Sequence, residues 1–268
     1  SISEEIKIAN NINLYDVDGG HLAEMVRQEV ISRYGLKAYT EGWSVYTTLD
    51  SKSQNTAKNS LLEQLYAYDK RHGWKESDNY SDIFNEQEAL SLSLLDLDFL
   101  FNNEYTNNID LDSSLISNKI LSIFDLYPYY NSHIKSIVIV VKENEFLAIN
   151  NNFEVIKVNW SNEYEWARKR ISIDELGSKP KNFNDILNFG DFVYLKINEG
   201  FYTLDQIPEA EASLISINPK SSEIIAYVGG KNFMASNFDR VKLSFPQSGS
   251  SFKPFIYSKL EARGLSST

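Results

Sequence analysis

The sequence predicts an α+β fold, and three observations support this prediction. Residues before about 75 include apolar side chains that recur at helical spacing. Residues 130–206 contain several short apolar segments at close spacing, which is typical of a small β-barrel or sandwich. The chain has 268 residues, of which 42% are hydrophobic and 24% charged, an ordinary composition for folded domains with a sizeable core.

The first part of the chain predicts a helix and then a strand. The helix is expected over about 21–34 and ends at Gly35, because these residues recur at helical spacing: Leu22, Met25, Val26, Glu29, Val30 and Arg33. A strand is expected over about 43–49, where alternate positions share one character: Trp43, Val45, Thr47 and Leu49.

A longer helix is expected over about 51–72. Asp50-Ser51 is suited to cap its N-terminus, and Gly73 is suited to end it. Its apolar stripe consists of Ala57, Leu61, Leu62, Leu65 and Tyr68.

The composition changes near residue 75 and becomes rich in Asn, Ser, Asp and Leu up to about 130. Short helices are expected near 86–101 and 113–125, and Pro128 marks a boundary. Strands are then expected over 134–141, 145–149, 153–158, 191–197 and 200–204, the last two joined as a hairpin across Asn198-Glu199.

Another change follows Pro208. Two apolar strands, 212–217 and 223–228, are joined by residues 218–221 (NPKS), which suit a type I turn with Pro at its second position. The remaining features follow in order: Gly229-Gly230 ends the hairpin, a loop runs to Gly249, and a last helix begins near Ser250.

The composition also excludes several functions. The net charge of −11, concentrated in 76–112 and 143–175, argues against binding to nucleic acid and is interpreted as solvated faces and loops. There is no Cys, and His21, His72 and His133 lack metal-ligand spacing, so no metal site, cofactor or histidine-based serine triad is expected.

No run of eighteen apolar residues is present that would predict a membrane span. Because the chain starts at Ser1 rather than Met, we expect an internal piece of a longer protein.

The motif that best predicts chemistry is Ser250-Ser251-Phe252-Lys253, an S-x-x-K pattern of serine acyltransferases. Residues three apart share a helix face, so Lys253 is placed to accept a proton from Ser250. The backbone N–H of Ser250, at a helix start, is a candidate for half of an oxyanion hole. The spacing alone is also compatible with a capping Ser and a solvated Lys.

Similar patterns elsewhere predict no chemistry. The S-x-x-K at 132–135 enters a strand, and the one at 178–181 holds Pro in a loop. Ser77-Asp78-Asn79 matches the S-D-N that accompanies S-x-x-K, but it lies upstream in a polar segment and is interpreted as a turn. The K-T-G element is absent from the sequence.

Three ordered blocks resemble the class A penicillin-binding proteins of the 1A type. Residues 206–257 carry a proline-ended strand, a hairpin that ends in Gly-Gly and the box QSGSSFKPF. Residues 22–71 resemble the linker that follows the family's glycosyltransferase domain and opens its transpeptidase domain. Trp160, Trp166-Ala167-Arg168 and 183–191 resemble motifs of its inserted OB-like domain.

The resemblance implies a partial penicillin-binding serine transpeptidase domain with an inserted OB-like β-barrel. The implied parts are a linker (1–34), a first transpeptidase segment (35–75), a helical acidic lead-in (76–129), the OB-like domain (130–206) and a second transpeptidase segment with the S-x-x-K helix (207–268).

By the same resemblance, Ser250 is the acyl nucleophile and Lys253 its base. The implied substrates are peptidoglycan stem peptides that end in D-Ala-D-Ala, and β-lactams acylate Ser250 in their place. The implied parent is also a peptidoglycan glycosyltransferase, held in the bacterial inner membrane by an N-terminal anchor and facing the periplasm.

The sequence departs from the family pattern in several places. Residues 76–128 match nothing in it, Asp239 replaces a common Asn, and Ser221 stands where the turn usually carries Thr-Gly. Residues 244–246 (SFP) replace a basic residue and its neighbours. The downstream S-x-N and K-T-G elements are absent, so this chain is expected to have little transpeptidase activity alone.

An alternative is that the OB-like insert is a non-catalytic docking module for a cell-wall regulatory protein. OB folds bind oligosaccharides, proteins or nucleic acid on one face, so the fold alone does not choose among them. The acidity of the chain disfavours the nucleic-acid version.

Overall fold

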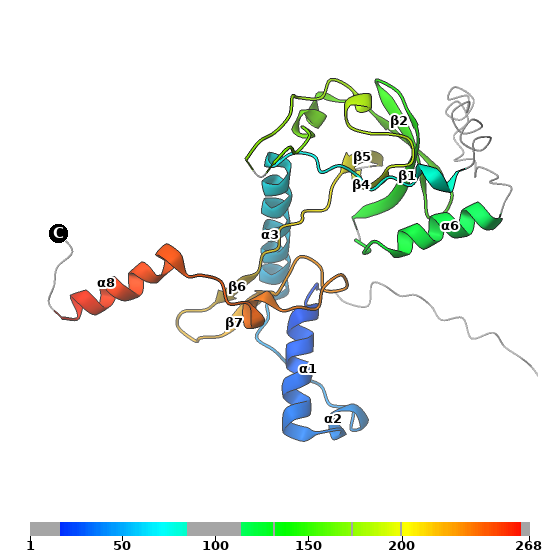
Figure 1. The fold of residues 1–268 in the computed structure, drawn as a ribbon. Helices are drawn as coiled ribbons and strands as arrows, with labels where there is room; N and C mark the ends of the chain where they lie inside the picture. Colours follow the sequence, from blue (N-terminus) through cyan, green and yellow to red (C-terminus); the bar gives the residue numbers. More distant parts are fainter. Residues whose placement is uncertain (1–16, 85–113, 131, 173, 199, 264–268) are drawn as a thin grey trace, which may run out of the picture.

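The computed structural model describes residues 17–84, 114–130, 132–172, 174–198 and 200–263. Helix α3 runs through its middle, with a curled sheet at one end and a two-stranded sheet at the other (Figure 1). Helices α1 and α2 lie beyond the two-stranded sheet, and α8 extends away from it (Figure 1). Mixed helices and sheets confirm the α+β prediction.

The N-terminal helices agree with the sequence, but the strand after them does not. Helix α1 (Gly20–Tyr34) ends at Gly35, whose φ of +66° favours glycine, and the short α2 (Lys37–Thr40) follows. The predicted strand over 43–49 is wrong, because this segment forms no ladder. Thr48 in this segment donates from Oγ1 to Ile224 O of strand β7 (Ile224–Val228) at 2.7 Å, and Asp50, just after it, donates from N to Ile225 O at 3.0 Å.

Helix α3 (Ser51–Arg71) forms as predicted. Asp50 caps it by accepting a hydrogen bond from Ser53 N at 2.7 Å, and the chain leaves the helix before Gly73, at φ +80°. Its buried stripe packs against the two-stranded sheet, in a core of Ala57, Leu61, Leu65, Ala226 and Val228. Tyr68, predicted in the stripe, is exposed and contacts the His72 ring instead.

The curled sheet has the strand order β3-β2-β1-β4-β5, with all neighbours antiparallel. Its strands are β1 (His133–Val141), β2 (Glu145–Asn150), β3 (Val155–Asn159), β4 (Phe192–Asn198) and β5 (Phe201–Asp205). Strands β3 and β5 at its two edges also come into contact, so the sheet curls toward a barrel.

Each face of this sheet has its own core. Helix α6 (Ser114–Asp125), predicted near 113–125, covers one face with Ile120, Ile123 and Phe124 against Ile137 and Ile149. The other face buries Val138, Phe146, Phe183, Trp74 and Leu195. The alternation of β1 between the two cores follows from the two-residue period of a strand. The predicted helix near 86–101 lies outside the described residues.

The last part of the chain holds the two-stranded sheet and the segment with the S-x-x-K motif. Strands β6 (Leu214–Ile217) and β7 are antiparallel, as predicted. The helix α7 (Arg240–Leu243), which was not predicted, follows the Gly-Gly turn. The predicted last helix is α8 (Lys253–Glu261), and a 3₁₀ turn over Gly249–Phe252 precedes it.

Candidate functional site

Ser250 and Lys253 lie on one 3₁₀ turn that leads into α8. Gly249 opens the turn at φ +49°, a conformation that suits glycine, and the Lys253 N–H donates to the Ser250 carbonyl. In a 3₁₀ helix the side chains three residues apart eclipse each other, so this turn brings the two side chains to the same side. The N–H of Ser250 donates to no acceptor within the described part of the chain.

The surroundings of this motif are open. Both side chains are exposed, and no hydrogen bond joins the Ser250 hydroxyl to the Lys253 amine in the residues that the structure describes. Apolar side chains around them are exposed too, among them Phe245, which is 97% exposed, Phe252 and Phe255. The geometry therefore supplies the spacing of a nucleophile and its base, and their roles stay a prediction.

The other S-x-x-K patterns lack this arrangement. Lys135 lies on β1 and donates to the carbonyls of Phe124 (2.6 Å) and Tyr127 (2.7 Å). Burial lowers the pKa of this amine, but its two acceptors make it a structural link to α6. Ser132 instead contacts His133 Nδ1 at 2.9 Å. Residues 178–181 lie in a loop outside any helix.

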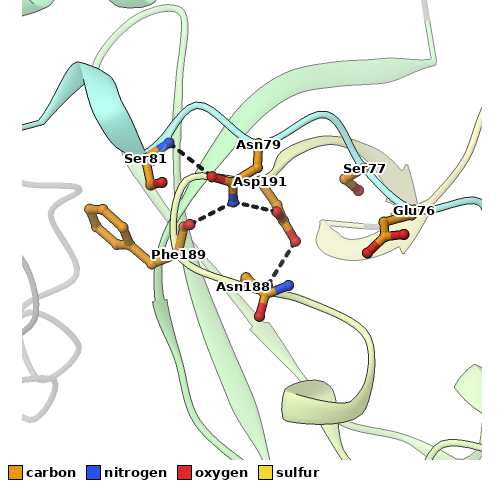
Figure 2. A pocket seen from close by; sticks show the side chains of 7 residues that line it. All are labelled: Glu76, Ser77, Asn79, Ser81, Asn188, Phe189 and Asp191. Carbon is orange, nitrogen blue, oxygen red and sulfur yellow. Dashed lines mark hydrogen bonds between the residues drawn. The ribbon is translucent and has the colours of Figure 1, made fainter.

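Ser77 and Asn79 line a hollow beside the start of β4, and Figure 2 shows Asn79 and Asp191 facing each other there. Asn79 Nδ2 donates to Asp191 Oδ1 at 2.7 Å and to Phe189 O at 2.8 Å, while Asn79 Oδ1 accepts from Ser81 N. Burial raises the pKa of Asp191, against hydrogen bonds from Asn79 and Asn188 that lower it. These partners hold the segment against β4. The predicted turn is wrong, because residues 77–79 form no turn and Asn79 instead pairs with Asp191 as an isolated bridge.

A second cluster, which the sequence did not predict, joins α3 to β7. Gln54, which is 1% exposed, accepts from Tyr227 N at 2.7 Å and donates to Tyr227 O at 2.9 Å. It also donates to Asp18 O at 2.8 Å. The Gln54 amide thus satisfies the backbone N–H and C=O of Tyr227, as a neighbouring strand would. The buried Lys58 amine pairs with Asp18 at 2.8 Å and reaches Gly230 O at 3.3 Å.

A third group, centred on His21 and Asp239, lies beside it. His21 is buried against the Gly-Gly turn, and its Nε2 lies 3.2 Å from Ser236 O. Asp239 Oδ2 accepts from the Tyr227 hydroxyl at 2.6 Å, and Asp239 Oδ1 caps α7 through Val241 N and Lys242 N. We call His21, Tyr227 and Asp239 the latch.

A buried polar junction joins α3 to the curled sheet. Asp205, which is 1% exposed, accepts from Lys70 Nζ at 3.0 Å and lies 3.3 Å from His133 Nε2. Burial would raise the pKa of the Asp205 carboxyl, but hydrogen bonds and charge from His133 and Lys70 leave it lowered. Nearby, Asp69 accepts from Gln206 Nε2 at 2.7 Å and pairs with Arg170 at 3.4 Å.

Few local patterns in the sequence point to these buried polar groups. In the sequence, a single glutamine in a helix cannot be told from an exposed polar residue. The latch joins residues more than two hundred positions apart, so no local pattern reveals it. The Gly-Gly turn was the one visible clue, since a Cβ on Gly229 would lie 2.7 Å from the His21 ring. The packing roles of the histidines were not predicted.

Two features are absent from the residues that the structure describes. No helix among them is long and apolar enough to cross a bilayer. No group of three or more His, Asp or Glu side chains among them is arranged to hold a metal ion.

Comparisons with known proteins agree with this architecture. Residues 107–210 match the penicillin-binding protein OB-like domain, which covers the curled sheet. Penicillin-binding protein 1A of Vibrio cholerae is 31% identical over 93% of this chain, and that of Pseudomonas aeruginosa is 30% identical over 96%. This chain spans 28% of the length of each of these relatives.

A solved structure shows the same fold. The crystal structure of penicillin-binding protein 1A from Haemophilus influenzae matches with a TM-score of 0.65 and 26% identity, over 90% of this chain and 30% of that one. The predicted OB-like domain within a penicillin-binding protein segment is therefore confirmed, and a stand-alone docking module is not favoured. Together these matches support a fragment of a class A penicillin-binding protein of the 1A type as the identity of this chain.

Proposed function

We propose that this chain supplies the nucleophile of a DD-transpeptidase that cross-links peptidoglycan stem peptides. Ser250 attacks the carbonyl carbon between the two terminal D-Ala residues, and Lys253 takes the hydroxyl proton. The C–N bond breaks, D-Ala leaves with a proton, and an acyl-Ser250 ester remains. The amine of a second stem peptide then displaces Ser250 and completes the cross-link.

The observation that carries this proposal is the 3₁₀ turn. It aligns Ser250 with Lys253 through the Lys253 N–H to Ser250 carbonyl bond, and it leaves the N–H of Ser250 pointing to no acceptor in the described chain. A free N–H beside the nucleophile is what half of an oxyanion hole requires. The resemblance of the QSGSSFKPF box to the S-x-x-K box of penicillin-binding proteins supports the same roles.

The domain division follows from this function. Helix α3 packs on β7, which supports a single transpeptidase unit built from residues 35–75 and 207–268. Residues 1–34 are the linker from a glycosyltransferase domain, 76–129 the lead-in and 130–206 the OB-like domain. The proposed setting is the periplasmic face of a bacterial inner membrane, and a cell-wall regulatory protein at the OB-like domain stays a prediction.

Benzylpenicillin tests the assignment. A full-length protein that contains this chain is incubated with the drug, and its intact mass is measured. We expect a single adduct that Ser250→Ala abolishes, because the β-lactam amide opens onto the Ser250 oxygen. Lys253→Ala is expected to slow its formation by about a hundredfold or more.

Two results would oppose the proposal. An adduct that persists in Ser250→Ala assigns the nucleophile elsewhere. Absence of any adduct, in a protein whose fold is intact by circular dichroism, removes the acyltransfer role. The 268-residue chain alone is expected to react poorly, because no S-x-N or K-T-G element follows Lys253 in its sequence.

A further inference from the structure

We propose that His21 and Asp239 are positioning residues, which fix the segment carrying Ser250 to the two-stranded sheet and to helix α1. The inference rests on the proposed role of Ser250, and it makes α1 a working part of the acyltransfer unit rather than a passive linker.

The His21 side of the latch is closely packed. His21 Nε2 lies 3.2 Å from Ser236 O, and the ring packs edge-on against Phe233 with centroids 5.0 Å apart. A Cβ on Gly229 would lie 2.7 Å from the ring, so a residue larger than glycine at position 229 would clash with His21. The second residue of α1 thereby holds residues 229–236 in place.

The Asp239 side continues this hold toward Ser250. One carboxylate oxygen accepts from the Tyr227 hydroxyl of β7 at 2.6 Å, and the other caps α7. The Arg240 N–H also donates to Gly229 O at 2.9 Å. Ser244 Oγ donates to Arg240 O, which closes the end of α7.

The latch and Arg240, which also pairs with Glu211 at 3.5 Å, are the last anchors before the motif in the described chain. From Phe245 onward, the hydrogen bonds and ring contacts of the described residues stay within that segment, such as Ser251 N to Ser248 O at 3.0 Å and Phe252 against Phe255. Within this chain, the entry direction of the turn that holds Ser250 is therefore set by α7 and by the groups that hold α7.

The His21 ring acts as a neutral donor. Burial lowers the pKa of His21, while the Ser236 carbonyl and the charges of Asp239 and Asp18 raise it and Lys58 lowers it further. A neutral ring with its proton on Nε2 matches the carbonyl acceptor at Ser236.

Substitutions at His21 test the role in the full-length protein. His21→Leu removes the donor, whereas His21→Gln keeps a donor near the position of Nε2. We expect His21→Leu to lower the acylation rate constant at saturating fluorescent penicillin by about ten- to a hundredfold, and His21→Gln to restore most of the rate. His72→Leu, at a histidine far from the latch in sequence, serves as the control and is expected to react like wild type.

Substitutions at Asp239 test the positioning role independently of those at His21. Asp239→Ala is expected to slow acylation, because it removes the α7 cap and the Tyr227 acceptor together, while Asp239→Asn keeps one acceptor and is expected to retain most of the rate. In both arms, deuterium uptake of residues 231–243 is expected to rise in the slow variants only.

Three outcomes would contradict the positioning role or the proposed function. The positioning role is overturned if His21→Leu folds and acylates at the wild-type rate. It is also overturned if His21→Leu and His21→Gln lose rate equally in proportion to lost thermal stability, since that pattern indicates folding alone. If wild type forms no adduct at Ser250, the proposed function fails instead, and unchanged deuterium uptake in His21→Leu would then separately refute the latch.

Discussion

Ser222 sits in a backbone conformation that disfavours its side chain. It closes the β6–β7 hairpin at φ +61°, where Ser222 N donates to Asn218 O at 2.8 Å. A non-glycine residue there costs on the order of 1 kcal/mol, which glycine avoids at some loss of chain entropy. We therefore expect Ser222→Gly to raise the free energy of unfolding by about 0.5–1 kcal/mol, measured by urea denaturation.

Its neighbour provides the control. Ser221 has no positive φ, and its hydroxyl donates to Glu223 Oε2 at 2.7 Å. Ser221→Gly is expected to lower stability slightly, and a gain from this substitution equal to that from Ser222→Gly would contradict the backbone argument.

His21 predicts a pH dependence of stability. Burial lowers its folded pKa below the ordinary 6.5, so the unfolded chain binds more protons as the pH falls through that value. The free energy of unfolding then decreases toward acid, by at most about 1.4 kcal/mol per pH unit. His21→Gln lacks this titration. We expect the stability of wild type relative to His21→Gln to fall from about pH 7.5 to about pH 5.5, whereas a constant difference would mean that His21 titrates normally.

At the scale of elements, the sequence predicted what local patterns encode. Helix α3 has a cap, an apolar stripe and a terminal glycine, and β1 in the middle of the curled sheet has a β-branched run. The segment 43–49 has an alternating pattern but no partner strand, so it stays extended without a ladder. Helix α7 has four residues and a cap from Asp239, too short for any periodicity to reveal.

Gln54 gives a prediction about how α3 and β7 join. Its amide satisfies the Tyr227 N–H and C=O and the Asp18 carbonyl. Gln54→Met keeps the volume but leaves these groups unpaired, and each costs about 1–3 kcal/mol when buried. We expect a loss of about 3 kcal/mol in the free energy of unfolding, together with faster hydrogen exchange in β7.

Gln64 is the matched control on the same helix. It is exposed, so Gln64→Met is expected to change stability by less than about 0.5 kcal/mol. Equal effects at the two positions would show that helix propensity, rather than the strand-like pairing of Gln54, explains the loss.

At the scale of the whole molecule, the motif was predictable and its setting was not. Ser250 and Lys253 lie three positions apart, so spacing alone placed them on one turn. The polar junction instead gathers Lys70, His133 and Asp205 from three distant segments. No local sequence pattern predicts that these three side chains come into contact, because each one alone resembles an exposed charged residue or an isolated histidine.

This junction predicts how firmly the OB-like domain is held to α3. Asp205→Asn removes the carboxylate charge that Lys70 and His133 both contact, and it leaves the Lys70 ammonium without its partner. An uncompensated buried charge costs about 3 kcal/mol. Because Lys70 is 35% exposed, water offsets part of this, and we expect a loss of about 2 kcal/mol. Tryptophan fluorescence reports the change, since Lys70 lies 4.9 Å from the Trp166 ring.

A measurement at low pH and a substitution in an exposed ion pair serve as the two controls for the junction. The folded pKa of Asp205 is lowered, so its contribution is present above its ordinary value of 3.8 and is lost as the pH falls through the folded pKa. The difference between wild type and Asp205→Asn should therefore fade below about pH 3.8. Glu165 pairs with Lys179 at the surface, and Glu165→Gln is expected to cost less than about 0.5 kcal/mol. An Asp205→Asn effect that is equally small, or that persists in acid, would mean that apolar packing rather than this ion pair joins the OB-like domain to α3.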